Sequence, residues 1–233
     1  MKKSIWIAIM LCGMVSMLSA QENNRLKPAQ GNFTLEVGFN PVGMNPVMGM
    51  GLKGRYLITD RWFLRLNIPF DGSVTKNKFD VQLPDHTATT KSNFVSYGLL
   101  PGFEYHFTNV RRLSPYVGAE LGFIHNIFSY KRTDYLNNNV SNEYLMKNMD
   151  NQNNRSNISA RINILAGFDV YISKHLYLGV ELGLGFGMNS TLKAKEITRP
   201  ANGAEVEVKH DDKAVSTNFT IATQNLIRLG WAF

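Results

Sequence analysis

The clearest strand signal in the chain is Leu178-Gly-Val-Glu-Leu-Gly-Leu-Gly-Phe186. Large apolar side chains occupy every second position, and glycines with one glutamate occupy the positions between them. Because successive side chains of a β-strand point to opposite faces, this period of two predicts a strand with two unlike faces. One face is apolar, and the other is polar and built from small residues.

The same alternation recurs along the chain. Eight predicted strands lie in 32–40, 48–58, 62–71, 94–107, 116–123, 161–170, 178–186 and 220–233. Three connections are short, at 59–61, 108–114 and 173–175, and three are long, at 72–93, 126–157 and 188–218. Short turns on one side and long loops on the other are typical of a membrane barrel. The pattern therefore predicts an all-β fold in which residues 32–233 form an eight-stranded antiparallel transmembrane β-barrel with short periplasmic turns and long extracellular loops.

The polar face distinguishes a membrane barrel from a soluble barrel that encloses a ligand. It carries five acidic and five basic residues: Glu36, Lys53, Arg55, Arg65, Glu104, Glu120, Arg161, Asp169, Glu181 and Arg228. Such an equal tally is expected in a closed lumen, where each buried charge needs a partner. The many glycines on the same face leave space for long side chains inside a narrow barrel. We therefore predict an internal charge network and an apolar face that meets lipid.

Three details refine this prediction. Aromatic residues of the apolar face form two groups that fit the two bilayer interfaces. The group beside the short turns is Trp62, Tyr105, Phe107, Tyr177, Trp231 and Phe233, and the group near the long loops is Phe39, Phe70, Phe94 and Phe186. Pro101 removes a ladder hydrogen bond within the fourth strand and predicts a β-bulge there. Thr223 and Asn225 fall on the lipid side of the last strand, which predicts a shift of register.

The N-terminus has the features of an export signal. Lys2 and Lys3 precede a short apolar run that ends at Ala20, before a polar stretch. We predict a signal peptide at 1–20 and a periplasmic segment at 21–31. Removing the signal leaves 23 basic and 18 acidic residues, a net charge of +5. Cys12 is the one cysteine of the chain and lies in the signal, which excludes a disulfide framework and a cysteine-based metal site.

The last residues are Ile227-Arg-Leu-Gly-Trp-Ala-Phe233, with large apolar side chains at every second position. They resemble the terminal strand signal of outer-membrane barrels, carried here by Ile227, Leu229, Trp231 and Phe233. Together with Leu100-Pro-Gly-Phe-Glu-Tyr-His-Phe107 and the strand 113–123, they resemble the small OmpA-like and OmpX-like barrels of Bacteroidota. The resemblance implies residence in a bacterial outer membrane. It also implies contact with its lipid and lipopolysaccharide, and with the barrel assembly machinery during biogenesis.

The charged lumen allows two functions. It is either a plug of salt bridges that fastens the barrel or the lining of a narrow conductive path, and the small bore of eight strands favours the plug. A catalytic site has little support. His125 and Ser129 share a strand face but lie about 13 Å apart along it, and His106 near Glu104 is expected to contact internal charges. The sequence predicts no enzyme, no cofactor and no metal site.

The long loops are rich in asparagine and charged residues, which hydrate well. Exposed loops on a rigid scaffold commonly carry binding residues, so host or cell-surface ligands are candidate partners, whereas scattered basic residues argue against nucleic acid. Residues 204–209 alternate and predict a strand above the membrane, after a turn at Asn202-Gly203. The sequence therefore predicts a non-enzymatic integral outer-membrane protein that contributes to envelope integrity and to surface interaction or adhesion. The alternative is a narrow porin-like channel for ions or small solutes.

Overall fold

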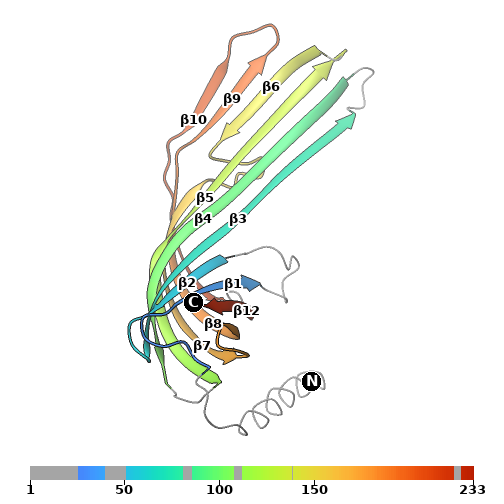
Figure 1. Cartoon of the computed structure of the whole chain (residues 1–233). Helices are drawn as coiled ribbons and strands as arrows, with labels where there is room; N and C mark the ends of the chain where they lie inside the picture. Colours follow the sequence, from blue (N-terminus) through green and yellow to red (C-terminus); the bar gives the residue numbers. More distant parts are fainter. Residues whose placement is uncertain (1–25, 40–50, 81–85, 108–111, 138, 223–226) are drawn as a thin grey trace, which may run out of the picture.

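The computed structural model describes residues 26–39, 51–80, 86–107, 112–137, 139–222 and 227–233 of the chain (Figure 1). All strand pairs among them are antiparallel, so the predicted all-β fold is confirmed. No helix in these ranges is long and apolar enough to cross a membrane. The predicted signal peptide at 1–20 and the residues Thr223 and Asn225 lie outside the described residues.

Eight strands close into a ring, as predicted. Their bounds are β1 Phe33–Phe39, β2 Gly51–Leu57, β3 Trp62–Asp80, β4 His86–His106, β5 Leu113–Leu136, β7 Asn157–Tyr171, β8 Leu176–Thr191 and a last strand described in two parts, β11 Val215–Ala222 and β12 Ile227–Ala232. Both parts pair with β8. The ring closes where β12 pairs with β1, with Leu35 opposite Trp231. The first and last strands of the barrel are therefore neighbours.

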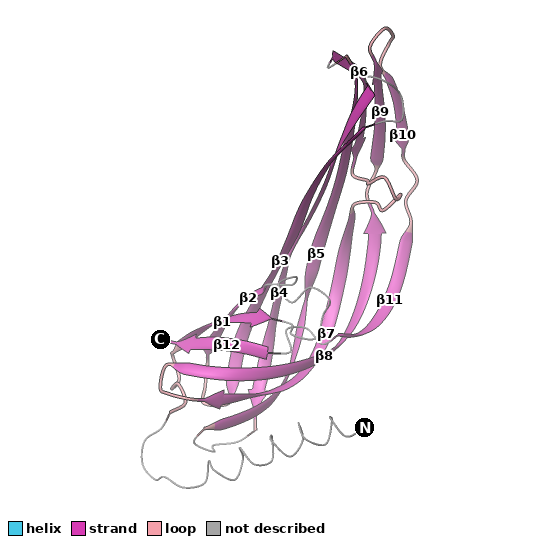
Figure 2. Ribbon diagram, turned by 90° about the vertical axis from the view of Figure 1, so that its right-hand side faces the viewer, coloured by secondary structure: helices cyan, strands magenta, loops and turns pink. Residues whose placement is uncertain are grey.

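The long connections are built largely of strands, of which the sequence analysis predicted only the one at 204–209. β3, β4 and β5 continue beyond the ring, and β6 (Asn139–Lys147), β9 (Ala194–Pro200) and β10 (Val206–His210) join them. The resulting sheet, which we call the tall sheet, has the order β10-β9-β6-β5-β4-β3 and rises from one end of the ring (Figures 1 and 2). These segments are rich in Thr, Val and Tyr, and pairing them satisfies backbone groups that would otherwise need water. The strand predicted at 204–209 is confirmed as β10, after a turn at 201–205.

The short connections lie together at the opposite end of the ring. In the β2–β3 turn the hydroxyl of Thr59 accepts a hydrogen bond from the backbone N–H of Trp62 at 3.0 Å. In the β7–β8 turn the hydroxyl of Ser173 accepts a hydrogen bond from the backbone N–H of Leu176, also at 3.0 Å. Hydroxyl side chains that accept backbone hydrogen bonds are a common way to tighten a turn. Phe233 donates its N–H to Phe33 at this end of the barrel.

The two faces of the barrel differ as predicted. On the outward face Leu121, Ile164 and Leu182 are 54–65% exposed, although each is large and apolar. On the inward face Arg55 and Glu104 are at most 1% exposed. An apolar exterior around a polar interior is the arrangement of a barrel that sits in lipid.

Two of the aromatic assignments and the bulge were wrong. Tyr177 and Phe94 point inward, because each shares its strand parity with lumen residues rather than with the apolar face. Tyr177 is 0% exposed, and the Phe94 ring is tilted against that of Phe128, with centroids 4.9 Å apart. Pro101 causes no bulge, since the β3–β4 register is the same on both sides of it. A proline removes one N–H but inserts no residue, so the ladder loses a bond without a shift.

Candidate functional site: the filled lumen

Arg55 on β2 lies among three carboxylates that come from three other strands. Its Nη1 atom lies 2.8 Å from Glu104 Oε2 and 2.8 Å from Asp169 Oδ2. Its Nη2 atom forms an ion pair with Glu36. The guanidinium presents several N–H groups in a fixed plane, so one side chain can serve several carboxylates. Arg55 thereby connects β2 to β1, β4 and β7 through the lumen.

Arg65 on β3 extends this group to β5 and β8. It contacts Glu104 Oε1 at 2.8 Å, Glu120 Oε2 at 2.9 Å and Glu181 Oε2 at 2.9 Å. Lys53 Nζ reaches Glu181 Oε1 at 2.9 Å. Because Glu104 binds both Arg55 and Arg65, all these charges form one connected network.

Arg228 connects β12 to β1 and β7 within the same network. It contacts Glu36 Oε2 at 2.7 Å and Asp169 Oδ1 at 2.8 Å. A Cβ atom at Gly179 would lie 2.6 Å from both Arg228 Nη2 and Asp169 Oδ1. A larger residue at this position would displace the ion pair, because the backbone of β8 passes directly beneath it.

Nine of the ten charged residues that the sequence singled out belong to this network, which we call the lumen network. Its members are Glu36, Lys53, Arg55, Arg65, Glu104, Glu120, Asp169, Glu181 and Arg228, and each side chain is at most 3% exposed. Charges so far removed from water cost several kcal/mol each unless they are paired. Their mutual pairing is what makes a charged interior compatible with a stable barrel.

Arg161 on β7 is not part of the lumen network. It lies between Gly122 of β5 and Gly187 of β8, further toward the tall sheet than Asn163, and is partly exposed. No carboxylate in the described ranges pairs with it. The carboxylate nearest to it on β5 is Glu120, which lies one inward-facing row below, opposite Asn163. Asn163 already donates to Glu120 at 2.8 Å, and Arg65 is paired with it.

Two tyrosines support the carboxylates from the same face. Tyr177 donates its hydroxyl to Glu36 Oε1 at 2.9 Å, and Tyr116 donates to Glu181. Both rings also lie under cations, with the guanidinium carbon of Arg55 5.2 Å from the Tyr177 centroid and 5.9 Å from that of Tyr116. The parity of Tyr116 in the alternation placed it on the polar face, but nothing in the sequence indicated its partner.

A buried serine, histidine and glutamate lie in a row at the turn end of the lumen. His106 Nδ1 lies 2.7 Å from Ser114 Oγ, and His106 Nε2 lies 3.2 Å from Glu104 Oε2. The order of groups is that of a hydrolase triad. All three side chains are at most 2% exposed, and the same carboxylate is already bound by Arg55 and Arg65. Each group of the row is therefore already engaged inside the lumen.

His125 and Ser129 are not brought together. His125 Nδ1 is bonded to the Tyr97 hydroxyl at 2.9 Å, and Ser129 accepts from Asn93 at 3.1 Å. In the described part of the chain, no three His, Cys, Asp or Glu side chains gather as a metal ion would require.

The residues of the terminal strand signal lie on β12 and at the chain end. Leu229, Trp231 and Phe233 are 46–59% exposed on the outward face, and Ile227 is partly exposed beside them. Recognition of this face by the assembly machinery remains a prediction.

Comparisons with known proteins point to one family. The model of the putative OmpA-OmpF-like porin family matches residues 40–233. Among solved structures, the chain is similar to the N-terminal β-barrel domain of Pseudomonas aeruginosa OprF, at 15% identity and a TM-score of 0.38 over 88% of this chain and 100% of that one. It is also similar to the outer membrane protein OprG of the same species, at 12% identity and 0.38 over 90% and 99%. Ail, the attachment invasion locus protein of Yersinia pestis, aligns at 12% identity and 0.36 over 88% and 99%. A search of curated proteins gave no match.

Proposed function

Because this chain belongs to the putative OmpA-OmpF-like porin family, we propose that it works as a sealed, non-enzymatic barrel of the outer membrane. In this role the barrel contributes to envelope integrity and carries the tall sheet outside the cell, where that sheet contacts partners. The membership itself places the chain in the outer membrane as an integral β-barrel. It does not distinguish a sealed barrel from a channel.

The observation that carries the proposal is the lumen network. Its cations and carboxylates reach across the ring from all eight strands, and none of its side chains is more than 3% exposed. A conductive path needs water along its length, but every charged member of the network here forms an ion pair with an opposite charge. The arrangement therefore favours stability of the barrel over passage of ions.

Planar-bilayer recording of the purified protein tests this proposal. We expect the native protein to give no steady single-channel openings. Arg65→Ala removes the cation shared by Glu104, Glu120 and Glu181, and we expect it to introduce openings. Arg161→Ala is the matched control, because this arginine lies outside the network. Steady openings of the native protein that an Arg55 or Glu120 substitution abolishes would contradict the sealed barrel.

A narrow porin-like channel is the second candidate, and the porin description of the family favours it. The partly exposed Arg161 at the wide end of the lumen would then act as an anion-attracting residue. The same recordings decide between the two candidates, since a channel of this kind should lose conductance when Arg161 is replaced.

A further inference from the structure

We propose that the tall sheet binds a phosphorylated saccharide of the surrounding outer leaflet, at a row of lysines on the face that continues the lipid-facing side of the barrel. The inference deepens the surface role proposed above and rests on it only for which end of the barrel points outward. The site is made by Lys76 of β3, Lys91 of β4 and Lys131 of β5, with Lys78 beside them.

The three lysines are direct cross-strand neighbours. Lys76 lies opposite Lys91 in the β3–β4 pair, and Lys91 lies opposite Lys131 in the β4–β5 pair. Side chains paired in this way point to the same face with Cβ atoms about 5 Å apart, and like charges so placed destabilise a sheet. Three successive strands carry lysines at these positions in spite of the repulsion. An anion bound by all three lysines would explain this arrangement.

Neighbouring groups leave most of this positive charge uncompensated. Lys131 forms an ion pair with Glu143. For Lys76, Lys78 and Lys91, the ranges that the structure describes contain no ion-pair partner. All four lysines are exposed. Charge complementarity therefore favours a ligand with more than one negative charge.

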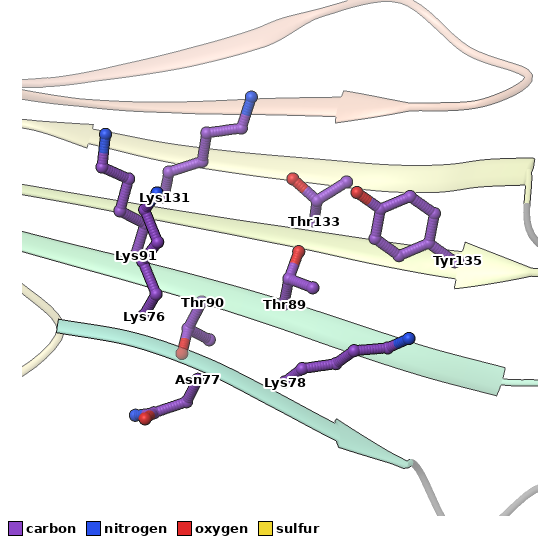
Figure 3. A pocket seen from close by; sticks show the side chains of 9 residues that line it. All are labelled: Lys76, Asn77, Lys78, Thr89, Thr90, Lys91, Lys131, Thr133 and Tyr135. Carbon is purple, nitrogen blue, oxygen red and sulfur yellow. The ribbon is translucent and has the colours of Figure 1, made fainter.

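The lysines border a hollow of about 510 Å³, seen from close by in Figure 3. The side chains of Thr89 and Thr133 also line it. They belong to the next row on the same face, in which Thr89 is paired with Lys78 on one side and with Thr133 on the other. Hydroxyl groups beside ammonium groups can serve both the phosphate and the sugar hydroxyls of a phosphosaccharide. The hollow is large enough for a sugar residue with its phosphate and is open to one side.

The position of the row identifies the source of the ligand. On each of the three strands, the residue six positions closer to the ring is aromatic: Phe70, Tyr97 and His125, which also form one cross-strand row. At about 3.3 Å per residue, the lysines lie roughly 20 Å along the strands from these rings. The rows between them change from Gly72, Val95 and Ile127 to Val74, Asn93 and Ser129. The same face thus passes from apolar to polar to cationic, which is the order in which lipid chains, sugars and core phosphates follow one another outward in lipopolysaccharide.

The test measures binding of the full mature chain in detergent micelles to lipopolysaccharide with a phosphorylated inner core. We expect the triple variant K76Q/K91Q/K131Q to lose about tenfold or more in affinity, because it removes several charge-assisted hydrogen bonds. The variant K193Q/K195Q/K209Q is the matched control. It removes the same charge from exposed lysines that are already paired with Asp211 and Glu207, and we expect its affinity to change less than about twofold.

Two further binding measurements distinguish the possible sources of the ligand. Dephosphorylated lipopolysaccharide should bind the native protein as weakly as the phosphorylated form binds the triple variant. Heparin oligosaccharide, a soluble sulfated glycan, should bind more weakly than lipopolysaccharide. Equal losses in the two triple variants, or no loss in either, would overturn the site. Tight, lysine-dependent binding of heparin without binding of lipopolysaccharide would overturn the assignment to the membrane. None of these outcomes depends on whether the lumen conducts.

Discussion

Arg228 has 1% of its side chain exposed and lies between the carboxylates of Glu36 and Asp169. Replacing it by methionine keeps much of its volume but leaves two buried carboxylates without this partner. Breaking a buried pair from one side costs about 3–5 kcal/mol, so we expect Arg228→Met to lower the free energy of unfolding by about that amount in urea titrations in detergent micelles. Arg161→Met should change it by less than about 1 kcal/mol, since this arginine has no ion pair among the described residues to lose. Equal effects of the two substitutions would show that the network contributes nothing specific.

Gly230 on β12 tests how tightly the lumen is filled. A Cβ atom there would lie 2.0 Å from Cζ of Tyr177. We expect Gly230→Ala to destabilise the barrel by about 1–3 kcal/mol, because the ring has no free space to move into. In a Tyr177→Ala background the same change should cost much less, and the double-mutant cycle measures this coupling. Additive effects would mean that the tyrosine moves aside without cost.

The residues of the lumen could be predicted, but their partners could not. Strand parity alone selected Glu36, Arg55 and the other charges as inward-facing. Which carboxylate meets which cation depends on stagger between strands far apart in sequence, as with Arg228 and Glu36. The alternation also gave no means to exclude Arg161, because its parity is that of the lumen residues and its isolation depends on which carboxylates lie level with it on other strands.

At the scale of elements, Glu143 of β6 joins two neighbouring strands of the tall sheet. It pairs with Lys131 of β5 and lies 3.0 Å from Arg199 of β9. The hydrogen bond from Lys131, together with that from Arg199, lowers the pKa of Glu143 below its usual value. A carboxylate with a lowered pKa in the folded state adds stability above its unfolded value of about 4.3, and this contribution disappears as the pH falls through the folded value.

The pH dependence of the tall sheet follows from this pair. We expect amide protection in β6 and β9 to fall as the pH drops below about 4, by no more than about 1 kcal/mol because the groups are partly hydrated. Hydrogen exchange corrected for the intrinsic rate measures it. Glu143→Gln should abolish the dependence in this window while leaving the barrel strands unchanged. If the pH dependence of amide protection persisted in the Glu143→Gln variant, it would belong to another titratable group.

The strands of the barrel were predicted better than those of the tall sheet. Inside the membrane, one face of each strand is apolar, so the period of two is visible in the sequence. Above it, segments such as 87–90 carry threonines on both faces, and the alternation disappears. Residues 72–80 of β3 and 126–136 of β5 therefore resembled loops until their strand partners were known.

At the scale of the molecule, the tall sheet and the short turns lie at opposite ends of one barrel (Figure 2). This arrangement predicts which sites a membrane-impermeant thiol reagent can reach. Cys12 is the one cysteine of the chain, so single reporters are easily introduced. We expect Gly203→Cys, in the β9–β10 turn, to be labelled on intact cells and Ser173→Cys, in the β7–β8 turn, to be labelled only after lysis. Labelling of Ser173→Cys on intact cells would reverse the orientation of the barrel.

The sequence by itself determined the class of fold, the number of strands in the ring and the face of each strand that meets lipid. It could do so because a bilayer requires an apolar side chain at every second position of a barrel strand. This requirement is visible within each short segment of the sequence. Only the tertiary structure decided how the charges pair and that the long connections form a sheet. Those features arise where strands distant in sequence meet, as when β4 brings Lys91 between Lys76 and Lys131, and no local pattern encodes such a meeting.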